Sequence, residues 1–487
     1  MIFATRTLLL AALCCAGTLA WAFWLGQPDW PLDDAYIVQH SVNGLKAGGV
    51  DSRFAGSTPL QGATSIVHVL AIAALSSLIS VGWAQVIVAA LAIFAYLAGN
   101  LRLADQAGLA APWPALLALL GVLSGFNAIH LVNGLETGMA MAAVVWTLVL
   151  FRDPLPVHAS AFALIGLMPF IRPELGALGA LIGLRALWAL RGAGHVMPRL
   201  GAMIGWGLAG LLPFALVMIV REGTLLPNTV AAKQYFFVGA CRPFLDRLTL
   251  AATNFGWYIG GMSLTGLALL AVFATRYRWI AAGFLVVFLG AYLMRFPSGL
   301  VHNWARYPHI LTPFVLVGVI RILTIRGQVF NRPPGQVLVL AALALAVIEF
   351  RHPVSLYGQQ IAFARQELAT VARWVETHVP PDAAILVHDA GYIALHGRQP
   401  LVDLVGLKTP SSIPSHRTYT YGSCSHDPRA VDEIARRNGT GYAVLLDDWD
   451  QGFAIGSGLA SLGWGVTRID TERGETAYRV YRIEPPK

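Results

Sequence analysis

The chain has 487 residues, of which 56% are hydrophobic and only 12% are charged, whereas an average soluble domain has roughly 25% charged residues. This composition excludes an ordinary soluble enzyme and predicts that most of the chain lies in a lipid bilayer. The formal net charge of +8 does not indicate nucleic-acid binding, because the lysines and arginines are spread over many short connections and form no basic stripe.

The first apolar stretch, 7–25, predicts a helix that stays in the membrane. It is long enough to span a bilayer, and Trp21, Phe23 and Trp24 crowd its end, where a cleavable signal peptide would have small residues. Further apolar runs bring the predicted total to about eleven transmembrane helices, the others lying near 82–99, 113–131, 137–151, 157–171, 174–190, 200–220, 251–274, 279–294, 307–325 and 336–350.

The run 64–80 is expected to lie against the outer face of the membrane rather than to span it, because His68, Ser76, Ser77 and Ser80 interrupt it. With the N-terminus inside, this assignment puts many arginines at cytoplasmic helix ends, as the positive-inside rule requires. Among them are Arg6, Arg102, Arg185, Arg276 and Arg321. If 64–80 spanned, every later loop would invert. An odd number of spans also places the C-terminus outside.

Beyond residue 350 charged residues become frequent, which predicts a soluble domain. Short apolar runs at 383–387 and 442–446 are typical of strands, two further strands are expected at 464–469 and 477–483, and helices are expected at 362–378 and 431–438. We therefore expect a polytopic α-helical transmembrane catalytic domain, 1–350, followed by an extracytoplasmic α/β domain, 351–487.

The four cysteines indicate the compartment of the outer loops. Cys14 and Cys15 lie in the first helix, where they are expected to act as apolar fillers. Cys241 and Cys424 fall in predicted extracytoplasmic segments, where a disulfide can form. Spacing alone leaves a bridge and two unrelated thiols as alternatives. No Cys/His spacing indicates a zinc site.

Two adjacent carboxylates, Asp33 and Asp34, follow the first helix directly. Charged side chains near the hydrocarbon boundary are costly and usually functional, and a carboxylate held there can act as a general base on a substrate that is partly in the lipid. The alternative is that one of the two caps the following helix.

Five motifs in the predicted outer segments carry a family resemblance: Asp33-Asp34-Ala35-Tyr36-Ile37, Gly134-Leu135-Glu136-Thr137, Arg172-Pro173-Glu174, Leu225-Leu226-Pro227-Asn228-Thr229 with Ala232-Lys233, and Asp403-Leu404-Val405-Gly406-Leu407. Together they resemble the GT-C superfamily of membrane glycosyltransferases, most of all its bacterial arabinofuranosyltransferase-like branch. The resemblance implies an inverting transfer of a sugar, arabinofuranose in this branch, from a polyprenyl-phosphate donor to a glycan or protein acceptor outside the cytoplasmic membrane.

The resemblance assigns the role of base to Asp33, with Asp34 orienting an arginine, the acceptor or a metal. Positive charge is needed for the departing lipid phosphate, and arginine suits it because its fork makes two parallel bonds. The expected substrate-binding residues are Glu136, Arg172, Glu174, Asn228, Lys233, Arg295, His302 and Arg306.

Structural roles compete with several of these assignments. Glu136 could cap a helix, and Arg172 and Glu174 could simply pair within their turn. Lys233 opens a stretch with Tyr235, Phe236 and Phe237 that is expected to be an amphipathic helix in the headgroup region. Interfacial anchoring could explain Trp304 and Tyr307, one of the two arginines Arg295 and Arg306, and the histidines His302 and His309.

No cofactor follows from the sequence beyond a possible divalent cation, for which Asp34 and Glu136 are candidate ligands. Two other function classes remain open: a polytopic transporter or flippase of lipid-linked sugars, and a polysaccharide polymerase or ligase that depends on outer-loop arginines such as Arg242. The expected location is a bacterial cytoplasmic membrane, with the lipid bilayer, the lipid donor and the acceptor as partners.

Overall fold

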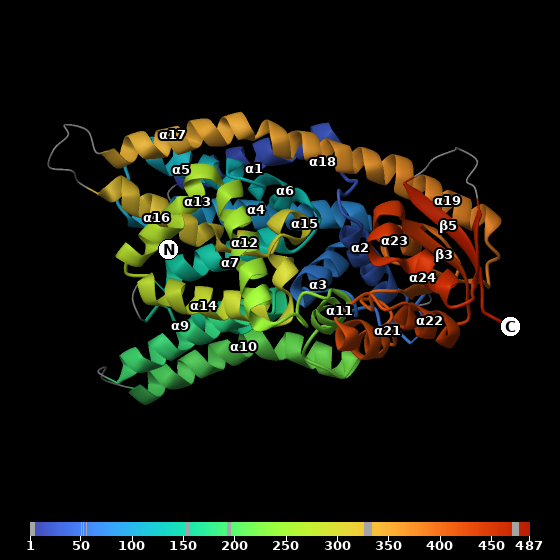
Figure 1. Ribbon diagram of the computed structural model, residues 1–487. Helices are drawn as coiled ribbons and strands as arrows, with labels where there is room; N and C mark the ends of the chain where they lie inside the picture. Colours follow the sequence, from blue (N-terminus) through green and yellow to red (C-terminus); the bar gives the residue numbers. More distant parts are fainter. Residues whose placement is uncertain are drawn as a thin grey trace.

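A computed structural model of the protein describes residues 5–49, 51, 53–54, 56–151, 155–156, 158–191, 196–325, 334–469 and 477–487. Most of these residues are helical, and a small sheet lies at the end of the molecule where the C-terminus is found (Figure 1). The helices up to residue 349 are α1 (Thr5–Leu25), α2 (Asp33–Lys46), α3 (Ile66–Leu75), α4 (Val81–Gln106), α5 (Trp113–Leu123), α6 (Asn127–Val132), α7 (Thr137–Leu150), α8 (Phe162–Ile171), α9 (Leu175–Leu190), α10 (Val196–Glu222), α11 (Thr229–Phe236), α12 (Phe244–Gly261), α13 (Ser263–Leu267), α14 (Arg278–Arg295), α15 (His302–Ala305), α16 (Thr312–Thr324) and α17 (Pro334–Glu349), with 3-10 turns η1 (Ala159–Ala161), η2 (Ala268–Ala274), η3 (Pro297–Leu300) and η4 (Pro308–Leu311).

Six of the described helical segments are long and apolar enough to cross a membrane: Arg6–Leu25, Val81–Gln106, Val196–Glu222, Arg278–Arg295, His302–Thr324 and Gly335–His378. Each overlaps a span expected from the sequence. The protein is therefore a multi-pass membrane protein, as its composition predicts.

The other five expected spans correspond to shorter apolar helices: Trp113–Leu123, Thr137–Leu150, Ala159–Ile171, Leu175–Leu190 and Ser263–Ala274. Two of them are shorter because the helix breaks: α5 ends at Leu123, and α12 ends at Gly261 just before Ser263, whose φ is 51°. The count of eleven spans remains a prediction.

Helix α3 lies inside the run 64–80 and has 10 residues. At 1.5 Å per residue it is about 15 Å long, roughly half the thickness of a bilayer core. By itself it is too short to span, and its expected position against the outer face remains a prediction. It packs on α2, α4 and α8.

The end of the membrane part and the start of the soluble part share one long helical segment. α17 continues through α18 (Arg351–Phe363) and the π-turn η5 (Ala364–Leu368) into α19 (Ala369–His378). In Figure 1 this segment, in orange, runs from the membrane helices to the sheet. The two helices expected at 336–350 and 362–378 are thus one, and the predicted domain boundary at 351 falls inside it.

The C-terminal domain contains a five-stranded sheet with strand order β2-β1-β3-β5-β4. Its strands are β1 (Ala384–Val387), β2 (Leu401–Asp403), β3 (Thr440–Leu446), β4 (Gly465–Ile469) and β5 (Tyr478–Glu484), and its remaining helical segments are α20 (Tyr392–His396), α21 (Ser412–Ser415), η6 (His416–Tyr421), α22 (Pro428–Arg437), α23 (Asp447–Phe453) and α24 (Ile455–Ser461). Strands β2, β1 and β3 are parallel, and β5 and β4 are antiparallel.

All four strands expected from the sequence are confirmed, as β1, β3, β4 and β5. The three-residue β2 was not predicted, since three residues are too few to show a period. The carboxyl ends of the parallel strands share one edge of the sheet, where His388 follows β1 and Asp447 follows β3.

A buried ion pair joins the C-terminal domain to the segment between α2 and α3. Lys408 Nζ lies 2.8 Å from Asp51 Oδ2, and both side chains are almost completely buried. The Lys408 ammonium and the nearby His40 offset the burial of Asp51 and hold its pKa below its usual range. Close by, the Arg53 guanidinium donates hydrogen bonds to the carbonyls of Gln399, at 2.8 Å, and Ala394, at 3.1 Å.

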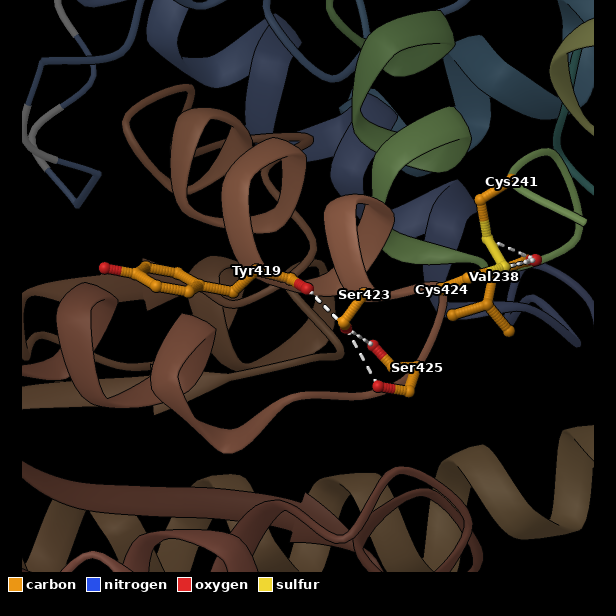
Figure 2. Close-up of a disulfide and its surroundings, with 6 residues drawn as sticks. All are labelled: Val238, Cys241, Tyr419, Ser423, Cys424 and Ser425. Carbon is orange, nitrogen blue, oxygen red and sulfur yellow. Dashed lines mark hydrogen bonds between the residues drawn. A yellow bond between two sulfur atoms is a disulfide. The ribbon is translucent and has the colours of Figure 1, made fainter.

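A disulfide makes a second connection between the two parts. Cys241, in the segment between α11 and α12, is bridged to Cys424, which follows η6, with Cα atoms 5.5 Å apart (Figure 2). Of the two alternatives that the sequence left open, the structure has the bridge. Cys14 and Cys15 are free and lie in α1.

Helix α11 makes a third connection, and here the expectation of a headgroup helix is wrong. Phe236 is buried and its ring packs against His416 and Trp449 of the C-terminal domain, while Tyr235 packs edge-on against Tyr421. Sequence periodicity shows that a helix has an apolar face, but it does not show whether that face meets lipid or another domain.

Candidate active site

Helix α2 turns the two adjacent aspartates toward different parts of the molecule. Asp33 and Asp34 are its first two residues, with Leu32 at the N-cap position, so neither caps the helix. Successive residues on an α-helix point about 100° apart. Asp33 therefore faces the C-terminal domain, and Asp34 faces the membrane helices.

Both carboxylate oxygens of Asp33 accept hydrogen bonds from the C-terminal domain. The backbone N–H of Gly391 donates to Oδ2 at 2.7 Å, and that of Tyr392 donates to Oδ1 at 2.8 Å. Burial, together with the negative charge of Asp389, raises the pKa of Asp33 well above its ordinary value despite these bonds. The side chain remains partly exposed.

Asp34 lies in the opposite electrostatic environment. Its Oδ2 is 3.0 Å from Nη1 of Arg306. Burial acts to raise the pKa of Asp34, but the positive charges of Lys233 and Arg306 together outweigh it and hold the pKa below its ordinary value. Two neighbouring carboxyl groups thus have pKa values that are moved in opposite directions.

Glu136, in the segment before α7, belongs to the same group of charged side chains as Asp34 and Arg306, here called the charged cluster. Gly134 makes this possible, because its φ is +77° and a Cβ there would lie 2.6 Å from the ring of Trp30 and 3.0 Å from Cβ of Ala35. Glu136 stands at the N-cap position of α7 without a capping bond, and its Oε1 lies 4.0 Å from Arg306 Nη2 and 3.9 Å from Arg172 Nε. Its side chain belongs to the charged cluster.

Arg172 and Glu174 occupy the turn between α8 and α9, as expected. Arg172 is fully buried and its Nη2 lies 2.6 Å from Oε1 of Glu174. The same Oε1 accepts a hydrogen bond from the hydroxyl of Tyr292, at 3.3 Å. The pairing within the turn that the sequence left open is therefore present, and the pair also adjoins Glu136.

Tyr307 stands at the centre of the cluster and is only 6% exposed, which does not favour the alternative that it anchors the chain at the interface. Three cations approach its ring: Arg172 at 4.8 Å, Arg306 at 5.1 Å and Lys233 at 5.5 Å from the centroid. Lys233 also donates a hydrogen bond to the Tyr307 hydroxyl, at 2.8 Å.

A cavity of about 320 Å³ opens beside this cluster. Its apolar wall comes from α9, α11 and α14, with Val230, Val287 and Phe288 among its residues, and its polar residues are Thr64, Glu174, Thr229, Lys233, Tyr292, Arg295 and Tyr307. Arg295 ends α14 and donates a hydrogen bond to Gln234, at 2.7 Å. The cavity is thus lined both by an apolar surface and by two cations, Lys233 and Arg295.

The remaining two expected site residues lie at the margin of this cluster. His302 stacks on the Tyr307 ring, with centroids 6.1 Å apart. Asn228 precedes α11 and does not belong to the described lining of the cavity, whereas its neighbour Thr229 does.

The backbone just before Arg306 has an unusual conformation that no sequence signal indicated. Asn303, Trp304 and Ala305 have φ of 49°, 59° and 60°, the left-handed region that is costly for residues other than glycine. His130 Nε2 contacts the Trp304 carbonyl at 2.9 Å, and His309 Nδ1 contacts the Ala305 carbonyl at 2.7 Å. These contacts hold the turn that directs Arg306 toward Asp34. His309, like Tyr307, is buried, which does not favour an interfacial role.

The donor set does not fit a divalent cation at Asp34 and Glu136. The guanidinium of Arg306 contacts both carboxylates, so a cation stands where a metal ion would have to bridge them. Among the residues that the structure describes, no group of three or more His, Cys, Asp or Glu side chains is placed to hold a metal.

Several buried polar atoms of the cluster are not hydrogen-bonded within the part of the protein that the structure describes. In the described part of the chain, Nη1 of Arg172, Nε of Arg306 and Oε1 of Glu136 have no hydrogen-bond partner. Buried polar groups are rarely left unpaired. The arrangement can therefore bind an anion that carries an apolar tail, next to carboxylates that can accept a proton.

Comparisons with known proteins bear on the fold. Residues 355–481 match a family model described as a domain of unknown function, DUF8728, and no curated protein sequence matches the chain. Among solved structures, ArnT from Cupriavidus metallidurans bound to undecaprenyl phosphate is 13% identical with a TM-score of 0.56, over 98% of this chain and 98% of that chain.

A second similar structure is arabinofuranosyltransferase AftD from Mycobacteria, which is 17% identical with a TM-score of 0.51 over 99% of this chain. The match covers 40% of the AftD chain, so this protein corresponds to less than half of it. At these identities the comparisons establish the fold. Over nearly its whole length, the chain has the fold of these two membrane proteins.

Proposed function

We propose that the protein is an inverting membrane glycosyltransferase that moves a sugar from a polyprenyl-phosphate donor to an acceptor outside the cytoplasm. The observation that carries the proposal is the cavity, whose lining combines an apolar wall with Lys233, Arg295 and Tyr307. Next to Tyr307 in the chain, Arg306 is paired with Asp34. The similar ArnT structure holds undecaprenyl phosphate, an apolar chain with an anionic end of the kind this cavity suits.

The donor phosphate would be bound by Lys233 and by the arginines around Tyr307, with its lipid along the apolar wall. Charge-assisted bonds from such cations stabilise the phosphate as it leaves. Asp34 orients Arg306 through their 3.0 Å contact. This is the orienting role expected for Asp34 from the sequence.

Asp33 is the better base of the two aspartates. A general base works best when its pKa lies near the working pH, and the pKa of Asp33 is raised whereas that of Asp34 is lowered. In the reaction, the acceptor hydroxyl gives its proton to Asp33 and its oxygen forms a bond to the anomeric carbon. The bond from that carbon to the phosphate oxygen breaks, and polyprenyl phosphate leaves with the electron pair.

The finer assignment of the sugar as arabinofuranose rests on the sequence motifs and on the similarity to AftD. The test is to incubate the purified protein with decaprenyl-phosphate arabinofuranose, and separately with other polyprenyl-phosphate sugars, in the presence of envelope glycans or surface proteins. We expect release of polyprenyl phosphate and a mass increase of the acceptor by one pentose. Release of lipid phosphate from no donor would contradict the proposed activity, and release from a non-pentose donor would correct the sugar.

The active site and the C-terminal domain are proposed to face the outside of a bacterial cytoplasmic membrane. The bridge between Cys241 and Cys424 supports this side, because disulfides persist in oxidising compartments. A reporter that is active only outside the cytoplasm should therefore be active when fused after Lys487 and silent when fused after Thr324, where α16 ends. Activity of the two fusions in the opposite sense would overturn both the orientation and the placement of the site.

A further inference from the structure

We propose that the C-terminal domain, whose sequence matches DUF8728, is part of the active site: its segment His388–Tyr392, here called the β1–α20 segment, holds the carboxylate of Asp33, and Asp389 is a positioning residue for it. The inference rests on the proposed function, since it concerns the base of that reaction. It gives this domain a task beyond covering the membrane helices.

The first observation is the fit between the β1–α20 segment and α2. Consecutive backbone N–H groups, of Gly391 and Tyr392, bind one oxygen each of Asp33 at 2.7 and 2.8 Å. This approach requires glycine, because a Cβ on Gly391 would lie 2.3 Å from the Asp33 carbonyl oxygen and 2.7 Å from the backbone nitrogen of Ile37. The segment is thus shaped to the first turn of α2.

The second observation is Asp389, which follows the carboxyl end of β1, the middle strand of the parallel part of the sheet. Ligands of α/β sheets commonly bind outside the carboxyl ends of their strands. The Tyr478 hydroxyl donates a hydrogen bond to Asp389 Oδ2, and His388 Nε2 lies 3.1 Å from that oxygen. With its side chain 25% exposed, Asp389 is fixed in direction but still open to a substrate.

The third observation is the way in which the domain is held. The buried pair of Lys408 and Asp51 connects it to the segment after α2, and the bridge between Cys241 and Cys424 and the packing of Phe236 connect it to the end of α11 and the residues that follow. A loop held by only one contact would position a carboxylate poorly. These three contacts restrict the movement of the β1–α20 segment relative to α2.

The groups around Asp33 affect its pKa, and so the pH at which it can take up a proton. The titratable groups facing it are Asp34 and Tyr36 on α2, and Asp389 and Tyr478 on the C-terminal domain. Burial acts to raise the pKa of Asp389, but the neighbouring His388 and the Tyr478 hydroxyl hold it below its ordinary value. Asp389 is therefore ionised when Asp33 titrates, and its negative charge favours the protonated form of Asp33.

The pH dependence of transfer tests this role. Turnover should fall as the pH decreases through the pKa of Asp33, because a protonated carboxyl cannot accept the acceptor proton. Asp389→Asn removes a negative charge, so the pKa of Asp33 should fall and the acid limb of the kcat profile should move to lower pH, by on the order of one unit. A residue that only supports the fold would change the height of the profile and leave the limb in place, and that result would overturn the role of Asp389.

A second pair of variants tests the segment without relying on titration. Gly391→Ala should lower kcat at least about tenfold with little change in KM for the donor, because the clash moves the segment away from Asp33. Gly452→Ala is the matched control: Gly452 lies in α23 of the same domain, and a Cβ there would meet nothing within 4 Å. It should behave as wild type.

The disulfide reports whether each variant still has a docked domain, since Cys241 and Cys424 belong to different parts of the chain. Non-reducing electrophoresis should show the bridge in all variants. If a bridged Gly391→Ala protein kept wild-type kcat, the segment would not position Asp33. These outcomes differ from a failure of the proposed function, in which the wild type itself transfers no sugar.

Discussion

Asp33→Asn is expected to reduce turnover by roughly 10²–10⁴, the range that positioned general bases contribute. Asparagine keeps the size of the side chain but takes up no proton at neutral pH. The affinity for the lipid donor should change little, because the base acts in the transition state and because the cations proposed to bind the phosphate are grouped around Tyr307. Single-turnover kinetics with labelled donor, together with donor binding, measure the two effects separately.

Asp34→Asn is the control for this variant. If Asp34 only orients Arg306, its loss should reduce turnover less than that of Asp33, and it should weaken the use of the donor. A larger loss of turnover at Asp34 would transfer the role of base to it. More than about a tenth of wild-type activity in a folded Asp33→Asn protein would remove Asp33 as the base. Glu136 and Glu174 would then be the next carboxylates to test.

The membrane architecture follows largely from hydropathy, because the long apolar runs of the sequence are helical in the structure. Hydropathy does not show where such a run breaks. The expected span 251–274 is divided at Met262 into α12 and α13. Helix α12 begins at Phe244, before the expected start of the span, with a polar first part. Strands β1 and β3 of the C-terminal domain were predictable for the same reason, because both are apolar runs, whereas β2 has only 3 residues.

The charged cluster was predictable as a set, because outer loops of neighbouring membrane helices meet at one surface. Arg172, Lys233 and Arg306 all approach the ring of Tyr307, although their contacts could not be known from the sequence. The opposite orientations of Asp33 and Asp34 were also not predictable. They depend on where α2 starts and on which segments lie beside it.

The contribution of the C-terminal domain was the least predictable part. Asp389 and Gly391 follow an apolar strand without any motif, and they matter because the domain packs on a helix more than 350 residues earlier in the chain. The left-handed turn before Arg306 contains no glycine, which removes the usual signal for such a backbone. Both features arise from tertiary contacts between segments that local patterns do not connect.

Arg306→Ala is expected to weaken binding of the lipid donor by roughly 10- to 100-fold, which corresponds to about 1.5–3 kcal/mol for lost charge-assisted bonds. The variant removes the cation that contacts both Asp34 and Glu136, so two carboxylates without that partner would then face the incoming phosphate. Arg306→Lys should recover only part of the affinity, because an ammonium lacks the planar fork that reaches both groups. Lys233→Ala should weaken donor binding in the same range.

The matched control for these variants is Arg242→Ala, since Arg242 is an exposed arginine in the segment that follows α11, the helix of Lys233. It should leave donor affinity unchanged. Because removing one partner of a buried ion pair can destabilise a protein by about 3–5 kcal/mol, thermal unfolding in detergent must first show that Arg306→Ala and Arg306→Lys are folded. Normal donor affinity in folded Arg306→Ala and Lys233→Ala proteins would restrict both residues to structural roles. A loss of activity confined to Arg242→Ala would instead favour a polymerase or ligase that uses outer-loop arginines, because Arg242 lies outside both the cavity lining and the Asp34–Arg306 pair.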